Sequence, residues 1–435
     1  MSRLRAVDEV VALTSALIRI DTTNVGDPHA PGTERAAAEY VAGMLAEVGY
    51  DPTYVESGAP GRGNVVVRLP GKDPSRGALL VHGHLDVVPA DPAEWSVHPF
   101  SGEVRDGYVW GRGAVDMKGT VATALALARQ FRREGTAPPR DLIFAFLADE
   151  EAGGRLGAQW LVDHRPDLFA GATEAISEVG GYSVTLGGHR AYLIQVAEKT
   201  SFWLRLAAHG VPGHGALLHP DNPIARLADA VARLDRHRFP LLLTDPVRGF
   251  LTGAADLLGS TFDPDDPEAT VARLGPLARL IGATLRDTAN VTMFRAGYKS
   301  NVVPSIATAE IDCRVLPGRL SAFEQELVDV LGPGIEAEWR HLPSWETTFD
   351  GPLVDAMTRA VTAEDPDARL LPYLLPAATD AKAFARLTIR TFGFAPLRLP
   401  PELDFSALFH GVDERVPVDA LEFGVQVLER FLLDC

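Results

Sequence analysis

The first half of the chain alternates between two hydrophobic patterns, one typical of helices and one typical of buried strands. In some segments apolar residues recur every three or four positions, and in others they form short continuous runs. We expect helices at 5–20, 32–48 and 118–133, and strands at 64–69, 78–84, 108–110 and 141–148. Strands that alternate with helices in this way predict an α/β fold, with a mostly parallel sheet covered by helices on both faces.

The pattern changes near residue 198. Residues 200–208 and 307–315 alternate between apolar and polar positions, which is typical of antiparallel strands with one exposed face. Amphipathic helices are predicted at 222–234 and 320–331, and a further strand at 334–339. Such a mixture predicts a smaller α+β unit.

The two patterns together predict an inserted domain. We expect residues 1–197 and 346–435 to form the first domain, which ends in an amphipathic helix at 417–433. Residues 198–345 would form the inserted α+β domain. Within it, the Asp-, Pro- and Gly-rich stretch 253–270 is predicted to be a surface loop.

Composition agrees with this division and excludes two classes of partner. A chain of 435 residues is long for a single hydrophobic core, and its 46% hydrophobic residues are ample for two. The formal net charge of -17 argues against nucleic acid and against an anionic membrane surface as partners, because both would repel it. Bound cations would offset part of this charge.

The cysteines and the amino-terminal segment exclude further classes. Cys313 and Cys435 are the only cysteines and are far apart, so neither a disulfide framework nor a thiolate metal site is expected. The first twenty residues carry charges throughout and resemble neither a signal peptide nor a membrane span. We therefore expect a cytoplasmic location.

Candidate chemistry begins at the carboxyl end of the predicted strand 78–84. Asp86 follows His84 by two positions, and side chains two apart along a strand point to the same side. One of them can ligate a metal ion while the other orients it. Functional groups in α/β sheets gather at the carboxyl ends of strands, where Glu150 and Glu151 are also predicted to lie.

Five clusters of potential metal ligands occur along the chain. They are His84 with Asp86, Asp116 in GRGAVDMKG, Glu150 and Glu151 in ADEEAGG, Glu178 in SEVGG, and His410 in ALFHGVDERV. Nitrogen and oxygen ligands without thiolates suit hydrolytic zinc, cobalt or manganese better than calcium or a structural zinc. One histidine or two adjacent glutamates is more often an ordinary surface feature. Carboxylates directly after a buried strand are costly unless a partner such as a cation compensates them.

Adjacent glutamates can divide two tasks. One of Glu150 and Glu151 can bind a metal ion, while the other accepts a proton from a water molecule that the ion acidifies. Asp116, with both carboxylate oxygens free, could bridge two ions about 3.5–4 Å apart. The glycines beside Asp116 and Glu151 would let the backbone approach closely, and ordinary turns explain them equally well.

In matching order over nearly the whole chain, GHLDVVP, GRGAVDMKG, DEEAGG and the late His410 resemble a family of di-zinc amidohydrolases and exopeptidases. That family includes acetylornithine deacetylase, succinyl-diaminopimelate desuccinylase, aminoacylase and glutamate carboxypeptidase. The resemblance implies two divalent metal ions, with zinc expected first and cobalt or manganese as alternatives. It implies that His84, Asp116 and Glu178 hold one ion, and that Asp116, Glu151 and His410 hold the other.

The resemblance also implies roles for residues around the ions. Asp86 would orient His84, and Glu150 would be the general base that activates the water between the metals and later protonates the leaving amine. The inserted domain would be the lid and dimerisation domain of a homodimer. From it, His214 in GVPGHGA would reach the partner's active site and stabilise the oxyanion.

Two further residues resemble binders of the substrate carboxylate. They are Asn301 in SNVVP and Arg314 in DCRVLPG, and a guanidinium suits this role because it can bind a carboxylate through two hydrogen bonds. Without the resemblance, Arg314 is more simply explained as a strand-edge salt bridge and His214 as a loop histidine.

Two positions depart from the family pattern. Glu178 stands where some members have aspartate, which indicates the deacylase-like branches. The segment PAATDAKAF lacks the two glycines that usually precede Thr-Asp-Ala, which leaves open the shape of the pocket near Thr379 and Asp380. Asp380 itself is predicted to lie either behind the metal ligands or in the pocket, and a helix cap is an equally good interpretation.

The resemblance implies a metal-dependent hydrolase that cleaves an amide or peptide bond next to a free carboxylate. Its substrate would be an N-acyl amino acid or a short peptide. A biosynthetic deacylase acting on acetylornithine or succinyl-diaminopimelate is an alternative within the same class. A non-catalytic binding protein on the same fold is the alternative from another class, and it is less favoured because every expected ligand and the expected base are present.

Overall fold

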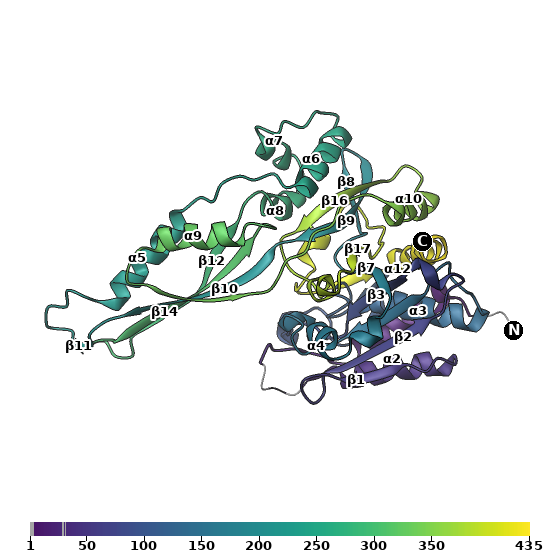
Figure 1. The fold of residues 1–435 in the computed structure, drawn as a ribbon, viewed down its shortest axis with the longest axis horizontal. Coiled ribbons are helices and arrows are strands. Elements are labelled where there is room, and N and C mark those ends of the chain that lie inside the picture. The colour runs from purple at the N-terminus through teal and green to yellow at the C-terminus, as the bar shows by residue number, and fades with distance from the viewer. Residues whose placement is uncertain (1–3, 28–29, 31) are drawn as a thin grey trace.

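The computed structural model describes residues 4–27, 30 and 32–435, and a nine-stranded sheet lies at its centre (Figure 1). The strands run in the order β1-β2-β6-β3-β7-β17-β9-β16, and β8 pairs with β9. Their bounds are β1 Thr53–Glu56, β2 Gly63–Leu69, β3 Ala78–His84, β6 Leu142–Leu147, β7 Ala172–Ser177, β8 Ser183–Leu186, β9 His189–Glu198, β16 Arg369–Leu375 and β17 Arg390–Gly393. The ladders β6–β3, β3–β7, β7–β17 and β9–β16 are parallel, so the middle of the sheet has the predicted character.

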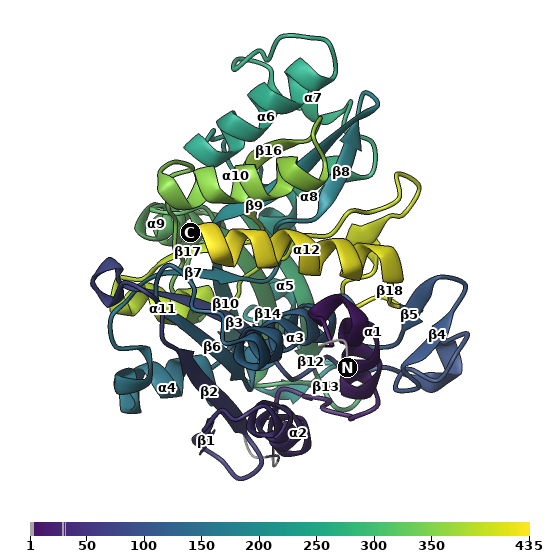
Figure 2. The ribbon, with the colours of Figure 1, turned by 90° about the vertical axis from the view of Figure 1, so that its right-hand side faces the viewer.

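Helices cover the sheet on both faces, as the α/β prediction requires. Along β3, Leu79 and Val81 face one hydrophobic core while Ala78 and Leu80 face the other, because neighbouring side chains on a strand alternate. Helices α1 Ala6–Ile18, α2 Arg35–Glu47, α3 Lys118–Glu134, α10 Pro352–Glu364 and α12 Val418–Asp434 contribute to the first core (Figure 2). Helices α4 Ala158–His164 and α11 Ala381–Phe384 contribute to the second.

Helix α3 is the central helix and fixes the segment that precedes it. It is rich in alanine and almost entirely buried, and these small side chains allow close packing against the sheet and against α1 and α12. Gly135 ends the helix in the left-handed conformation, where its N–H bonds to the carbonyl of Arg132. Because α3 begins at Lys118, Asp116 lies immediately before a rigid element.

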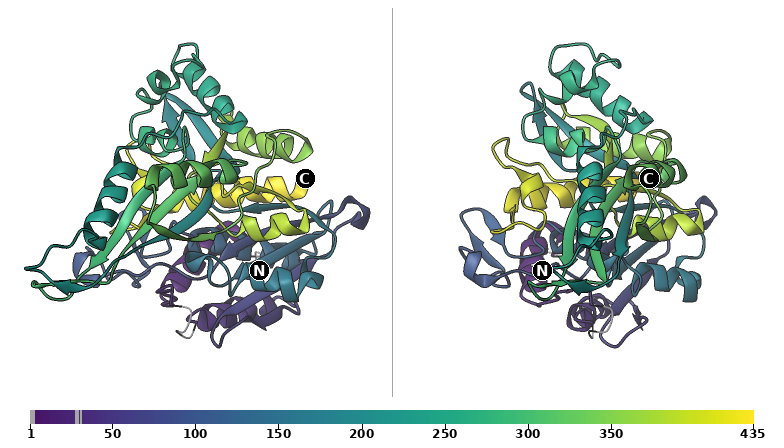
Figure 3. Two further views of the ribbon diagram at one scale, coloured as in Figure 1. Left: turned by 60° about the vertical axis from the view of Figure 1, so that its left-hand side comes forward. Right: turned by 90° about the vertical axis from the view of Figure 1, so that its left-hand side faces the viewer.

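The predicted α+β unit forms a separate four-stranded antiparallel sheet, which projects to one side of the large sheet (Figure 3). Its strands follow the order β12-β14-β10-β15, with bounds β12 Thr288–Ala296, β14 Ile306–Val315, β10 Thr200–His209 and β15 Glu336–His341. Phe202 and Leu204 are buried beneath helices α5 Pro223–Arg236 and α9 Leu320–Leu331, whereas Trp203 lies on the other face and is partly exposed. The predicted alternation is therefore present, and only Lys199 separates β9 from β10.

The predicted surface loop at 253–270 is wrong in part. The segment includes the end of α6 Asp245–Leu257 and the start of α7 Pro267–Val271, and α8 Leu277–Gly282 follows. Phe250 and Leu251 of α6 are buried in the large core, and the helix packs on β16. Its amphipathic face outweighs the local turn signals because it covers apolar surface of the large sheet. The segment from α6 to α8 thus packs on the large sheet although it lies within residues 198–345. We retain residues 198 and 345 as the proposed outer boundaries of the inserted domain.

Short strands join the remaining segments. β5 Tyr108–Trp110 pairs with both β4 Glu103–Arg105 and β18 Arg415–Pro417, and β11 Gly213–His214 pairs with β13 Val302–Val303. Among the described residues, no helix has the length and apolar character needed to cross a membrane.

Candidate metal centre

Three adjacent parallel strands, β6, β3 and β7, end at the same edge of the large sheet and carry most of the predicted ligands. His84 ends β3, the 3-10 turn η3 (Glu150–Ala152) follows β6, and Glu178 follows β7. Asp116 enters from the start of α3, and His410 from the segment before β18. The carboxyl ends of parallel strands bring these groups together at one edge.

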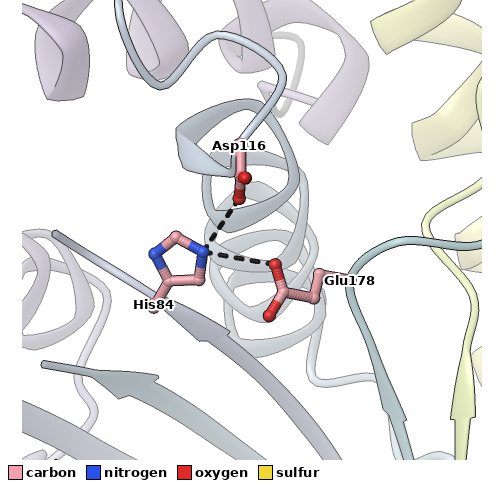
Figure 4. A group of neighbouring side chains, drawn as sticks. All are labelled: His84, Asp116 and Glu178. Atoms are coloured by element: carbon pink, nitrogen blue, oxygen red, sulfur yellow. Dashed lines mark hydrogen bonds and ion pairs between the residues drawn. The ribbon is translucent and has the colours of Figure 1, made fainter. Parts of the chain in front are cut away.

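The carboxylate of Asp116 lies between two histidines. The Nε2 atom of His84 lies 3.0 Å from Asp116 Oδ1 and 3.2 Å from Glu178 Oε2 (Figure 4). The Nε2 atom of His410 lies 3.4 Å from Asp116 Oδ2 and 3.1 Å from Glu151 Oε2. These side chains form two groups of three potential ligands that share Asp116.

The geometry of both groups fits a divalent metal ion. Ligand atoms at about 2.1 Å from a shared ion, with angles between 90° and 110°, lie roughly 3.0–3.4 Å from one another. The four distances above lie between 3.0 and 3.4 Å. In addition, the Oε1 atom of Glu151 is buried and has no hydrogen-bond partner among the described residues. A cation would supply the interaction that this oxygen lacks.

The charges at the site lead to the same conclusion. Burial raises the pKa of Glu151 to about 8, and the neighbouring Asp116 carboxylate adds to this shift. Burial alone would raise the pKa of Asp116, but hydrogen bonds with His410 and His84 hold it below its usual range. Hydrogen bonds to Asp116 and Glu151 raise the pKa of His410 to about 10. The crowded carboxylates thus favour protons on Glu151 and His410, and divalent cations would take the place of these protons.

Asp86 contacts His84 differently from the prediction. The Nδ1 atom of His84 lies 2.9 Å from the backbone carbonyl oxygen of Asp86 and 3.6 Å from its carboxylate. The carboxylate of Asp86 accepts hydrogen bonds from the backbone N–H groups of Glu150 and Glu151, at 3.1 Å each, and from the side chain of Asn24. Asp86 therefore fixes the turn that carries both glutamates, while its carbonyl oxygen orients the imidazole.

Glu150 faces a buried lysine that sequence reasoning missed. The Nζ atom of Lys382 lies 3.7 Å from Glu150 Oε1 and donates a hydrogen bond of 2.6 Å to the carbonyl oxygen of Thr379. The Lys382 side chain is fully buried, and burial alone would lower its pKa. Nearby carboxylates, chiefly Glu150 and then Asp380, outweigh this effect, so the pKa of Lys382 is raised. Its position in the apolar segment ATDAKAF was the only signal in the sequence.

A cavity of about 340 Å³ adjoins these residues and is also lined by Arg314 and Ser201 of the small sheet. Arg314 donates to both carboxylate oxygens of Asp312, at 2.7 and 3.0 Å, and through Nη1 to the hydroxyl of Ser201 at 2.5 Å. Arg314 thus lines the cavity, and it also forms the salt bridge within its strand that was the simpler explanation of this arginine.

Asp380 does not cap a helix and is not among the residues that line the cavity. It occupies the N-cap position of α11 without a side-chain cap bond, and both of its carboxylate oxygens are buried without a hydrogen-bond partner among the described residues. Burial raises its pKa, and repulsion by Glu150 adds to this. Gly154 adopts a positive φ of 71°, and a Cβ atom there would collide with Asp380 Oδ1, so one glycine of ADEEAGG does permit a close approach.

His214 and Asn301 do not reach the metal centre within one chain. Both lie at the tip of the projecting unit, where β11 pairs with β13 and the N–H of Gly215 bonds to the carbonyl oxygen of Asn301, and Figure 1 shows β11 far from β3 and β7. Neither side chain lines the 340 Å³ cavity.

The buried carboxyl group of Glu198 predicts a pH dependence of stability. Burial raises its pKa from 4.5 to about 8, and Lys382 offsets this only in part. Between these values the folded protein keeps a proton that the unfolded chain releases, so the free energy of unfolding falls as pH rises through this window. Glu198→Gln cannot ionise and keeps an oxygen for the bonds from Thr379. We expect its Tm to exceed that of the wild type by a margin that grows from about pH 5 to about pH 8. A constant margin in thermal denaturation would contradict this.

Comparison with known proteins gives a consistent picture. The model of peptidase family M20/M25/M40 matches residues 80–434. The N-fatty-acyl-amino acid synthase/hydrolase PM20D1 of Xenopus tropicalis is 28% identical over 442 residues, covering 96% of this chain and 84% of that protein. Human aminoacylase-1 is also 28% identical, over 86% of this chain and 84% of its own.

Solved structures share the fold at low sequence identity. The M20 family metallo-carboxypeptidase Sso-CP2 from Sulfolobus solfataricus superposes with a TM-score of 0.75 at 18% identity, covering 98% of this chain and 99% of its own. The YXEP protein of Bacillus subtilis, described as a dinuclear metal binding peptidase, gives a TM-score of 0.64 at 14% identity, with 98% of both chains covered.

Proposed function

The chain belongs to peptidase family M20/M25/M40, and from this premise we propose that it is a metal-dependent hydrolase of amide or peptide bonds next to a free carboxylate. One observation carries the proposal. The two groups of metal ligands share Asp116, and all their members except His84 line one cavity together with Glu150 and Arg314. A general base, a metal site and a carboxylate binder within one cavity are the parts that such a reaction needs.

We assign the two groups of ligands to two ions. His84, Asp116 and Glu178 would hold one, and Asp116, Glu151 and His410 the other, with zinc as the first candidate and cobalt or manganese as alternatives. When bound, such ions polarise the scissile carbonyl group and acidify a water molecule. The dinuclear description of the Bacillus subtilis relative supports the number of ions.

Glu150 is the group that moves the proton. It lies at the cavity wall and is not needed in either ligand group, so its carboxylate is free to accept a proton from the attacking water and to pass it to the nitrogen of the leaving amine. Lys382 keeps Glu150 in its place, since the two charges lie 3.7 Å apart and Lys382 is itself held by Thr379.

Arg314 and Ser201 are placed to bind the substrate carboxylate. Both line the cavity, and the Nη1 atom of Arg314 with the Ser201 hydroxyl forms a pair of polar groups that a carboxylate can join. Asp312 fixes the orientation of the guanidinium through its other two nitrogens.

The rest of the cavity wall favours an uncharged apolar group on the substrate. It includes the side chains of Val179, Tyr182, Leu280, Leu375 and Phe409. The side chain of acetylornithine and the distal groups of succinyl-diaminopimelate carry charges, and burying those charges against such a wall would be costly. We therefore favour an N-acyl amino acid with an apolar acyl group, or an apolar dipeptide, over these biosynthetic substrates.

A substrate panel tests the proposal. The enzyme would be assayed with N-acetyl, N-succinyl and longer N-acyl amino acids, and with dipeptides, each with added zinc, cobalt or manganese. We expect metal-dependent release of amino acid, fastest with apolar acyl groups. If the protein binds the metals but hydrolyses none of the compounds with any of them, this proposal is wrong and the non-catalytic alternative is favoured.

We also propose that the protein acts as a homodimer through the small sheet. The tip that carries His214 exposes Val211, Leu217, Leu218 and Tyr298, and apolar groups exposed together in this way are typical of an interface. Strand β12 is an edge strand with exposed Met293 and Phe294, which also favours pairing.

Mixing two inactive variants tests the role of His214 in trans. His214→Ala and Glu150→Ala should each be inactive alone, whereas a mixed dimer has one site with both groups intact. After subunit exchange at equal amounts we expect about a quarter of wild-type activity. Sedimentation that shows only monomers, together with a fully active His214→Ala variant, would remove this role.

A further inference from the structure

The carboxylate of Glu414 is fully buried and accepts hydrogen bonds from the segment that carries Asp116. Its Oε1 atom accepts from the backbone N–H groups of Val115, at 2.7 Å, and Asp116, at 3.0 Å. Its Oε2 atom accepts from the N–H of Gly113, at 3.0 Å. Three backbone donors in four residues thus point at one side chain from a distant part of the sequence. This side chain holds the peptide that bears the shared ligand.

Arg112 links the same carboxylate to the His410 segment. Its Nη1 atom donates to Glu414 Oε2 at 2.6 Å, and its Nη2 atom donates to the backbone carbonyl oxygen of His410 at 3.2 Å. The guanidinium also lies over the ring of Trp95, 5.2 Å from its centroid, and both partners of the ion pair are buried. One planar group therefore contacts both segments, with its orientation fixed on three sides.

The strands beside this pair keep the two segments together. β5 ends at Trp110 and pairs with β18, with Trp110 opposite Arg415, and the N–H of Gly111 bonds to the carbonyl oxygen of Glu414. Arg112 and Glu414 thus continue this ladder toward the metal centre. Beyond them lie Asp116 and His410, whose side chains are 3.4 Å apart.

We propose that Arg112 and Glu414 are positioning residues that set the spacing between His410 and Asp116 and so control the affinity of one of the two metal ions. The proposal rests on the metal site proposed above. His410 needs such support because its side chain is 55% exposed and its segment is a loop, whereas His84 lies on a buried strand. The ion of His84, Asp116 and Glu178 should depend less on the pair, because neither His84 nor Glu178 contacts it.

Zinc titration of the metal-free full-length protein, in competition with a chromophoric chelator, tests the proposal. In Glu414→Gln we expect the zinc held by Asp116, Glu151 and His410 to bind about 10- to 100-fold more weakly, and the other zinc to lose less affinity. Arg112→Lys keeps a charge beside Glu414 but loses the two-pronged contact, and it should weaken the same zinc to a smaller extent. Activity of both variants should return at saturating zinc.

Glu174→Gln is the matched control. Glu174 pairs with Arg140, another largely buried guanidinium, at the opposite ends of the strands. Loss of this ion pair in Glu174→Gln should lower the Tm and leave both zinc affinities unchanged. Wild-type zinc affinities in Glu414→Gln, or an equal loss of affinity at both sites, would overturn the proposal. If Glu414→Gln does not fold, the zinc affinities of Arg112→Lys decide by the same criterion. A wild-type protein that binds no zinc would instead refute the proposed function.

Discussion

Glu150→Ala lowers kcat by roughly 10²–10⁴-fold while the protein keeps both metal ions and its fold, because a positioned general base contributes that much to such reactions. Neither ligand group includes Glu150, so the metal content should equal that of the wild type. Lys382 would lose its neighbour but would remain close to other carboxylates, Asp380 and Glu198, so the fold should persist.

Steady-state kinetics with metal analysis of the same sample measures this effect. Glu94→Ala serves as the control, since it removes an exposed glutamate from the short turn 92–94. The control should keep wild-type kcat. Undiminished turnover by a fully metal-loaded Glu150→Ala variant would refute the assignment of the general base.

Loss of the shared ligand has the second large effect. Asp116→Ala should abolish binding of both ions, since one carboxylate oxygen faces each histidine, and turnover should fall by at least about 10³-fold as the electrostatic stabilisation of several kcal/mol is lost. Glu151→Ala and His410→Ala should each lose one ion, because each belongs to a single group. Elemental analysis after dialysis counts the ions per chain.

An exposed histidine offers the matched control for the metal ligands. His98→Ala should retain both ions, because His98 belongs to neither group and is exposed. Fully loaded Glu151→Ala and His410→Ala variants would overturn the ligand assignment. Addition of zinc to the metal-free wild type should also raise its Tm, by the equivalent of about 2.7 kcal/mol when zinc is at 100 times Kd.

Much of the fold follows from local patterns. The apolar runs at 78–84 and 141–148 form adjacent parallel strands, because a strand buried on both faces is apolar throughout. The alternating segment at 200–208 forms β10, because a strand buried on one face alternates between apolar and polar residues. Helix α6 was not predicted, and its last residues were assigned to a surface loop. Its glycine and aspartate residues weaken the helical pattern of apolar positions, and its apolar face has a function only because it packs on β16. Contacts between distant segments decide such cases.

The same distinction applies to the site. His84, Asp116, Glu151, Glu178 and His410 were identified because each lies in a distinctive motif, and the structure brings them together. Lys382 and Glu414 were missed because their importance comes from burial and from partners elsewhere in the sequence. The role proposed for His214 would require a second chain, which no pattern in one sequence describes.

The passage from α6 to α8 has a mechanical consequence. The chain crosses between the large body and the projecting sheet not only at Lys199 and near residue 345 but also before α6 and after α8, and the Nζ atom of Lys199 donates a 2.5 Å hydrogen bond to the carbonyl oxygen of Arg286, which joins two of these crossings. Four connections restrict the swinging of the projecting sheet relative to the large body. Because Ser201 and Arg314 of the projecting sheet line the same cavity as Leu280, which packs on the large core, any displacement of that sheet changes the width of the space that the substrate occupies.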